Sequence, residues 1–240
     1  TASLENLDLF VSRVGDLAPI SRLSRLRGLS VAAFSRVETL ADIARLEKLE
    51  LLRLSDLPRI GDFAPLAGLR RLRGLALSGS FTKAQKAASL DFLDEFDALT
   101  ELVLDGVRLA DGDLRPVARR HSLRFLSLGN GFPVREYARL SIALAGVECD
   151  AFRPTRPLRS LTWDPKANAM RTDPVGFDTV LIGKPVKLLR SRDAKDAALI
   201  AKRTVEFERW QAYYRGVPDP AADGRTTLPG APKPRTRPNS

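Results

Sequence analysis

A leucine frame returns along this chain at a nearly constant distance, and it restricts the possible folds more than any other feature. The frame reads Leu-x-x-Leu-x-Leu and is clearest in Leu49-Glu50-Leu51-Leu52-Arg53-Leu54. Its opening leucines are Leu4, Leu26, Leu49, Leu72, Leu99 and Leu123, which lie 22, 23, 23, 27 and 24 residues apart. A unit this short cannot bury an apolar face alone, so the repeat predicts a solenoid of stacked units.

Each unit contains two different hydrophobic periods. Alternation in the frame predicts a short strand whose Leu52 and Leu54 point into a core while Leu51 and Arg53 point outward. Further along, the apolar residues recur every third position, which predicts a return leg of 3₁₀ turns. In the third unit these residues are Ile60, Phe63, Leu66 and Leu69.

Two of the return legs carry a family resemblance. The stretches Val14-Gly15-Asp16-Leu17-Ala18-Pro19-Ile20-Ser21-Arg22-Leu23 and Ile60-Gly61-Asp62-Phe63-Ala64-Pro65-Leu66-Ala67-Gly68-Leu69 match the half-repeat I-x-D-I-x-P-L-x-x-L. The chain therefore resembles the short leucine-rich repeats of the SDS22-like and internalin-like type over about residues 4–152. The resemblance implies an α/β solenoid with a parallel concave sheet of about seven short strands and a convex side of 3₁₀ and helical turns.

The chain departs from the family where each strand turns into its loop. The family places asparagine there, whereas this chain has Ser12, Phe34, Leu57, Ser80, Val107 and Gly131. The buried backbone groups at these turns must therefore find other partners. The fourth unit also has an insertion at 81–89, which we expect to be helical with Lys83, Gln85 and Lys86 outside.

The domain organisation predicted from the sequence has four parts. Residues 1–152 are the solenoid, closed by a helix at 134–144 and a degenerate last strand around Cys149. Residues 153–192 are an irregular extension with a linker at 153–157 and strand candidates at 161–163 and 179–182. Residues 193–215 are a helix capped by Asp193, with Ala201 and Phe207 among the residues on its buried side. Its aromatic residues Trp210, Tyr213 and Tyr214 are expected to be buried against the last repeats. Residues 216–240 are a basic, proline-rich tail expected to be disordered.

Charge is concentrated after the repeats. Residues 1–152 hold 21 Lys and Arg against 20 Asp and Glu, whereas residues 153–240 hold 18 against 9. Binding of nucleic acid or an anionic surface by the C-terminal third is therefore an alternative function. The sequence has no apolar run long enough to span a membrane, and its single cysteine fits a reducing compartment, so we expect a cytoplasmic protein.

The residue types needed for catalysis are scarce. His121 is the one histidine and is expected on a surface loop, while Cys149 is expected to be a buried, inert thiol. One histidine and one cysteine cannot form a His/Cys zinc site. We therefore expect a protein that is not an enzyme and that needs no cofactor or metal.

A solenoid of this kind leaves the outward residues of its strands free for binding. The predicted protein-binding residues on the concave face are Asp8, Phe10, Leu51, Arg53, Glu101, Val103, Asp105 and Phe125. The alternative is that the basic C-terminal third covers this face. The first repeat begins at Leu4 with no polar cap before it, which would leave apolar core and a strand edge exposed, so we expect that Thr1 follows further sequence of a larger protein. By analogy with other leucine-rich repeats, this chain would then be the C-terminal sensing part of a receptor-like NTPase.

Overall fold

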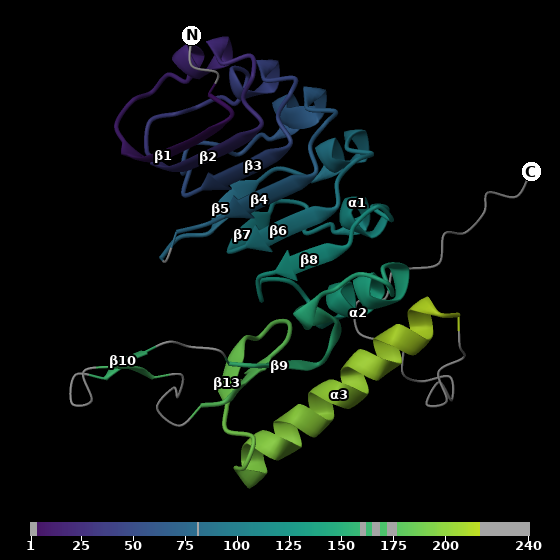
Figure 1. The fold of residues 1–240 in the computed structure, drawn as a ribbon. Helices are drawn as coiled ribbons and strands as arrows, with labels where there is room; N and C mark the ends of the chain where they lie inside the picture. The colour runs from purple at the N-terminus through teal and green to yellow at the C-terminus, as the bar shows by residue number, and fades with distance from the viewer. Residues whose placement is uncertain (1–3, 81, 159–161, 165–168, 172–176, 217–240) are drawn as a thin grey trace, which may run out of the picture.

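The computed structural model describes residues 4–80, 82–158, 162–164, 169–171 and 177–216. Its main feature is a parallel sheet of six strands that stack in the order of the repeats (Figure 1). The strands are β1 (Asn6–Ser12), β2 (Gly28–Phe34), β3 (Leu51–Ser55), β4 (Gly74–Ser78), β6 (Glu101–Asp105) and β8 (Phe125–Leu128). Beyond β8 a single parallel bridge joins Phe125 to Glu148, where the sequence predicted a degenerate last strand.

The leucine frame sets the register of this sheet. Leu52 lies between Leu29 and Leu75, and Leu54 lies between Val31 and Leu77. Leu52 and Leu54 are buried, whereas Leu51 is 52% exposed, so the predicted alternation is confirmed. Each buried leucine gains neighbours from the coils on both sides, which makes the core one continuous cluster.

The return legs are 3₁₀ turns, as the three-residue period predicted. They are η1 (Ala18–Arg22), η2 (Ile43–Arg45), η3 (Ala64–Gly68) and η4 (Asp91–Glu95), followed in the later coils by α1 (Arg115–Ala118), α2 (Val134–Ala143) and η5 (Asp150–Phe152). The side chains of Asp16 and Asp62 accept hydrogen bonds from the amides of Ala18 and Ala64, at 2.7 and 2.8 Å, and so hold the start of η1 and η3.

The insertion in the fourth coil is not helical, and this prediction was wrong. It contains a short strand, β5 (Gln85–Ala87), which pairs in parallel with β7 (Val107–Leu109). Gln85, expected outside, is buried. Its Oε1 accepts from the Leu57 amide at 3.0 Å, and its Nε2 donates to the carbonyls of Leu57 and Ile60 at 3.1 and 2.7 Å. The glutamine thus supplies the backbone partners that the missing asparagine would have given this coil.

The extension forms a small antiparallel sheet and a long helix beside the last coil (Figure 1). The sheet consists of β9 (Thr155–Pro157), β12 (Thr179–Leu181) and β13 (Lys187–Leu189), and a separate hairpin joins β10 (Thr162–Asp164) to β11 (Ala169–Arg171). Residues 153–157, predicted to be a linker, therefore contain a strand, because Thr155 and Arg156 pair with Leu181 and Val180.

The long helix α3 (Ala194–Tyr214) begins at the predicted cap. The Asp193 carboxylate accepts from the amides of Lys195 and Asp196 at 2.9 and 3.2 Å. Phe207 and Trp210 are buried in the same hydrophobic core as the solenoid leucines. Ala201, predicted on the buried side of the helix, is exposed. None of the described helices is long and apolar enough to cross a membrane. The predicted disordered tail falls almost entirely at 217–240, outside the described residues.

Candidate functional site

The outward residues of the six strands form three rows across the concave face. The strand register places Leu51 beside Gly74, then Glu101 and Phe125. It likewise places Asp8, Arg53 and Val103 in a second row, and Phe10 and Asp105 in a third. All eight predicted residues therefore lie on the outward face of one sheet.

Two glycines shape the middle of this face. A Cβ atom added at Gly74 would lie 2.7 Å from Leu51 Cδ2, and one added at Gly28 would lie 2.2 Å from Asn6 Oδ1. The glycines therefore leave room for the neighbouring Leu51 and Asn6 side chains to lie over the sheet. The result is a hollow of about 350 Å³, which we call the concave hollow.

The concave hollow contains five of the eight predicted residues. Its lining includes Asp8, Leu51, Arg53, Glu101 and Val103. Phe10, Asp105 and Phe125 lie outside it. Phe10 is 77% exposed and lines a separate apolar hollow with Val11 and Val14 at the first coil.

The charges in the concave hollow differ from charges elsewhere on the solenoid. Among the described residues, Asp8, Arg53 and Glu101 form no ion pair and no side-chain hydrogen bond, and all three are exposed. By contrast, Arg27 pairs with Glu50 at 3.0 Å across a coil boundary, and Arg70 pairs with Glu95 at 2.6 Å. The concave charges are therefore available to a ligand.

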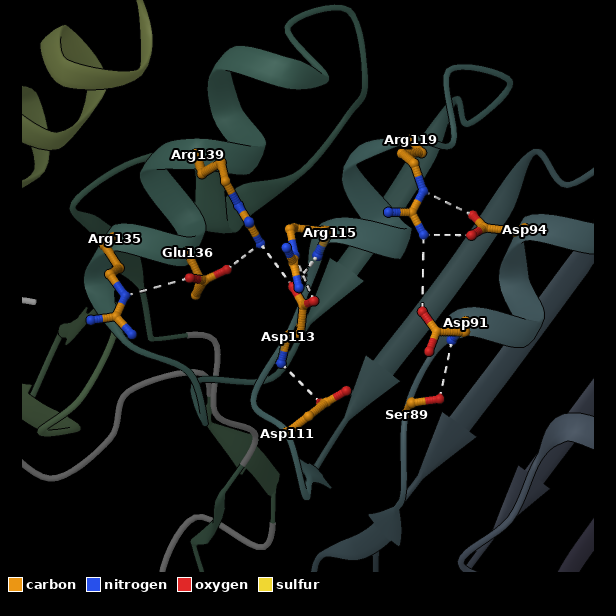
Figure 2. A network of polar contacts seen from close by, with 10 residues as sticks. All are labelled: Ser89, Asp91, Asp94, Asp111, Asp113, Arg115, Arg119, Arg135, Glu136 and Arg139. Atoms are coloured by element: carbon orange, nitrogen blue, oxygen red, sulfur yellow. Dashed lines mark hydrogen bonds and ion pairs between the residues drawn. The ribbon is translucent and has the colours of Figure 1, made fainter. Parts of the chain in front are cut away.

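The largest group of charged contacts lies in the later coils and is structural (Figure 2). Arg119 of one coil binds Asp94 of the preceding coil, and Arg139 of α2 pairs with both Asp113 and Glu136. Burial raises the pKa of Asp113, but hydrogen bonds from Arg115 and the positive charge of Arg139 outweigh it and leave this pKa below its usual value. Within the described ranges, no three His, Cys, Asp or Glu side chains are placed to hold a metal ion.

The sequence predicted His121 on the surface and Cys149 in the core, and the structure confirms the first placement but not the second. His121 is exposed in the turn before β8. Cys149 is half-buried, and desolvation raises the pKa of its thiol to about 11, so the thiol stays protonated near neutral pH.

The described part of the extension packs against the end of the solenoid and not over the concave face. Asn130 donates to the Leu181 carbonyl and accepts from the Gly183 amide, both at 2.6 Å, and Gln211 of α3 donates to Ser141 of α2 at 2.8 Å. This placement is contrary to the self-coverage alternative for the described residues. Trp210 is buried, as predicted, and stacks on the half-buried Tyr214, whereas Tyr213, also predicted to be buried, is exposed.

Repetition of one unit decides the fold. Every coil places a frame strand on the concave face, and a tight turn follows on the convex face through the first five coils. Residues 4–152 form a leucine-rich-repeat solenoid.

Comparison with known proteins gives matches among solved structures alone. No family model and no curated protein matches the sequence. Internalin C2 of Listeria monocytogenes is 20% identical with a TM-score of 0.47, over 61% of this chain and 60% of that one. The internalin inlF of the same organism is 19% identical with a TM-score of 0.42, over 61% and 47% of the two chains. A leucine-rich-repeat protein of Leptospira interrogans is 18% identical with a TM-score of 0.41, over 60% and 42%.

These matches leave large parts of the other proteins without a counterpart. The matched region spans less than two thirds of each solved chain. At such identities the comparison concerns the fold alone. The assignment of a leucine-rich-repeat solenoid is based on the repeated strands and turns of this chain itself. The leucine-rich-repeat fold is in general a scaffold for protein interaction.

Sequence reasoning missed one important side chain of the solenoid. Gln85 was placed outside because the insertion was interpreted as a helix, although a buried amide there completes the third coil. The missing asparagine at Leu57 was the signal that some other polar group had to reach this turn.

Proposed function

We propose that this chain is a non-catalytic recognition scaffold that binds a protein partner at the concave hollow. The observation that supports the proposal is the set of exposed charges without partners, Asp8, Arg53 and Glu101, beside the exposed apolar surface of Leu51. These side chains have no part in the core, so the fold does not account for them. Apolar anchors surrounded by charged groups are typical of protein interfaces.

The chemistry of the hollow indicates the kind of segment it would bind. Leu51 and Val103 offer an apolar contact. Arg53 shares its row with the acid Asp8, and the second acid, Glu101, lies in the neighbouring row with Leu51. A partner segment with an apolar side chain flanked by an acid and a base matches this arrangement. Arg53 is suited to a carboxylate, which it can bind through two parallel hydrogen bonds.

The test is capture of a partner by the chain and by a charge-reversed variant. The triple variant Arg53→Glu, Glu101→Lys, Asp105→Lys is expected to lose the partner from a nuclease-treated lysate of the source cell, with bound proteins identified by mass. Its melting temperature should stay unchanged, because all three side chains are exposed.

A matched control changes the same charges at another edge of the solenoid. Arg25→Glu, Glu47→Lys, Asp97→Lys involves exposed residues of the turns before the strands, and it should retain the partner. Equal capture by both triple variants and the original chain would refute the concave surface as the binding site.

The wider context of the chain is a further part of the proposal. The solenoid would be the sensing part of a larger, cytoplasmic, receptor-like protein, as the analogy with other leucine-rich repeats suggests. The alternative of nucleic-acid binding by the basic C-terminal third finds little support among the described residues. Of the aromatic rings Trp210, Tyr213 and Tyr214, Tyr213 alone is exposed, which gives no stacking platform.

A further inference from the structure

A row of cations lies at the C-terminal ends of the strands, where each strand leads into its return leg. The buried residues Leu17, Leu40, Phe63 and Leu90 each begin a return leg, and the residue four positions earlier is always basic. These residues are Arg13, Arg36, Arg59 and Lys86, and Arg108 continues the row by its register with Lys86. All five are exposed. We call this row the basic rim.

The register of β5 and β7 places two of these cations side by side. Lys86 and Arg108 are directly paired residues on adjacent parallel strands, and both point away from the core while the flanking Gln85, Ala87, Val107 and Leu109 are buried. Like charges in such a pair destabilise a sheet. The Lys86–Arg108 pair is therefore repulsive. By contrast, Arg27–Glu50 and Arg70–Glu95 are attractive pairs of opposite charges across coils.

Among the described residues, nearby acids neutralise one cation of the row, Arg59, and leave the other four without an ion pair. Glu38 pairs with Arg59 at 2.5 Å, and the carboxylates of Asp16 and Asp62 accept backbone amide hydrogen bonds. Asp56 also lies at this edge and forms no ion pair with a described residue. Arg13, Arg36, Lys86 and Arg108 likewise have no acidic partner in the described part of the chain.

At the end of the rim formed by Lys86 and Arg108, the surface has a hollow of about 450 Å³. Lys83 from the inserted loop joins Lys86 and Arg108 in its lining, together with the Thr82 hydroxyl and the single acid Asp56. Three cations thus meet at one concave place on the surface. Arg25 and Lys48, which precede the strands, form a second row of cations outside the lining of this hollow, with Glu47 next to Lys48 in the sequence.

We propose that the basic rim is a second binding site that takes an acidic, extended peptide segment. Carboxylates spaced along a peptide would meet one cation after another, and the Arg side chains can bind them through paired hydrogen bonds. A nucleic-acid strand fits less well, because the described residues that line the hollow offer no aromatic ring on which a base could stack. This proposal goes beyond the concave-face function and holds even if the concave hollow binds nothing.

The test measures binding of a fluorescein-labelled peptide of ten glutamates to the full chain by fluorescence anisotropy. The variant Lys86→Gln, Arg108→Gln should bind about tenfold more weakly, which is the effect of losing two solvent-exposed ion pairs with the peptide. The control variant Arg25→Gln, Lys48→Gln removes the same charge from adjacent coils and should bind within about twofold of the original chain. Any contribution of the basic tail is common to all these proteins and does not affect the comparison.

Further variants and a second probe make the result decisive. Lys86→Arg, Arg108→Lys keeps both charges and should bind normally, and the melting temperature of the glutamine variant should be equal or higher because a repulsive pair has been removed. Equal weakening by the rim and control variants, or no weakening by either, would overturn the proposal. Tighter binding of a ten-nucleotide deoxythymidine strand, lost in the rim variant, would replace the acidic peptide by a nucleic acid and also overturn it.

Discussion

At the scale of single residues, Gln85 shows how this chain compensates for a missing family feature. Its side chain forms hydrogen bonds with the Leu57 amide and with the carbonyls of Leu57, Ile60 and Lys86, at 2.7–3.1 Å. The amide group has both a donor and an acceptor, so a single side chain satisfies both polar groups of the Leu57 backbone. The turn of the third coil is therefore held by a residue of the fourth coil.

Replacing this amide should be costly. Gln85→Ala leaves the buried Leu57 amide and the Ile60 carbonyl without partners, and we expect the free energy of unfolding to fall by about 2–4 kcal/mol. Urea denaturation measures the change. Gln211→Ala is the control, because Gln211 is half-buried and its side chain donates to the hydroxyl of Ser141. This variant should lower the free energy of unfolding by less than about 1 kcal/mol. A loss no larger than that of the control would mean that water replaces the glutamine.

At the scale of elements, local sequence predicted those parts whose periodicity sets their structure. The frame leucines alternate and so predict the strands, and Ile60, Phe63 and Leu66 recur every third residue and so predict the convex turn. In both cases the spacing of the buried residues indicates which local structure places them on one face. The segment 134–144 was likewise predicted helical and forms α2.

Elements held by distant partners could not be predicted in this way. The stretch 85–87 is a strand because Gln85 reaches back to Leu57 and because Ala87 pairs with Leu109. Strand β9 exists through its pairing with β12, which comes more than twenty residues later. Nothing in the local sequence at 153–157 specifies that partner, so a proline-flanked strand was interpreted as a linker.

The helix α3 provides the prediction at this scale. Phe207 is 1% exposed and packs into the core cluster, while Val205 of the same helix is 57% exposed. Phe207→Ala should lower the free energy of unfolding by about 3–5 kcal/mol because it leaves a cavity in the packed region. Val205→Ala should change it by less than about 0.5 kcal/mol. Thermal unfolding followed by circular dichroism compares the two variants, and similar melting temperatures would show that α3 is not docked in solution.

At the scale of the whole molecule, the solenoid has two unlike ends. The last coil is covered by α2 and α3, where Trp210 and Phe207 extend the core. The first strand pairs with β2 on one side, and among the described residues no element pairs with its other side. The sequence predicted the stacking of coils from the repeat and the burial of Trp210 against the last repeats. It did not predict that α2 is the surface on which α3 docks, because the residues of α3 belong to no repeat.

The unlike ends lead to a prediction about how stability is distributed. Leu9 and Leu54 occupy equivalent positions in the strand register, but Leu54 is 2% exposed between two coils, whereas Leu9 is half-buried in the end coil. In a solenoid each coil is stabilised by its neighbours, so a leucine with neighbours on both sides loses more contacts when it is truncated. Leu54→Ala should therefore cost about 3–5 kcal/mol, and Leu9→Ala below about 2 kcal/mol.

Hydrogen exchange on the unmodified chain tests the same idea without a substitution. Backbone amides of β1 should exchange fastest among the sheet strands, and those of β3 and β4 slowest, because opening an end coil breaks one interface while opening a central coil breaks two. Equal costs for Leu9→Ala and Leu54→Ala, with uniform protection of all six strands, would instead mean that the sheet unfolds as one cooperative unit. The open β1 end would then be as stable as the end covered by α3.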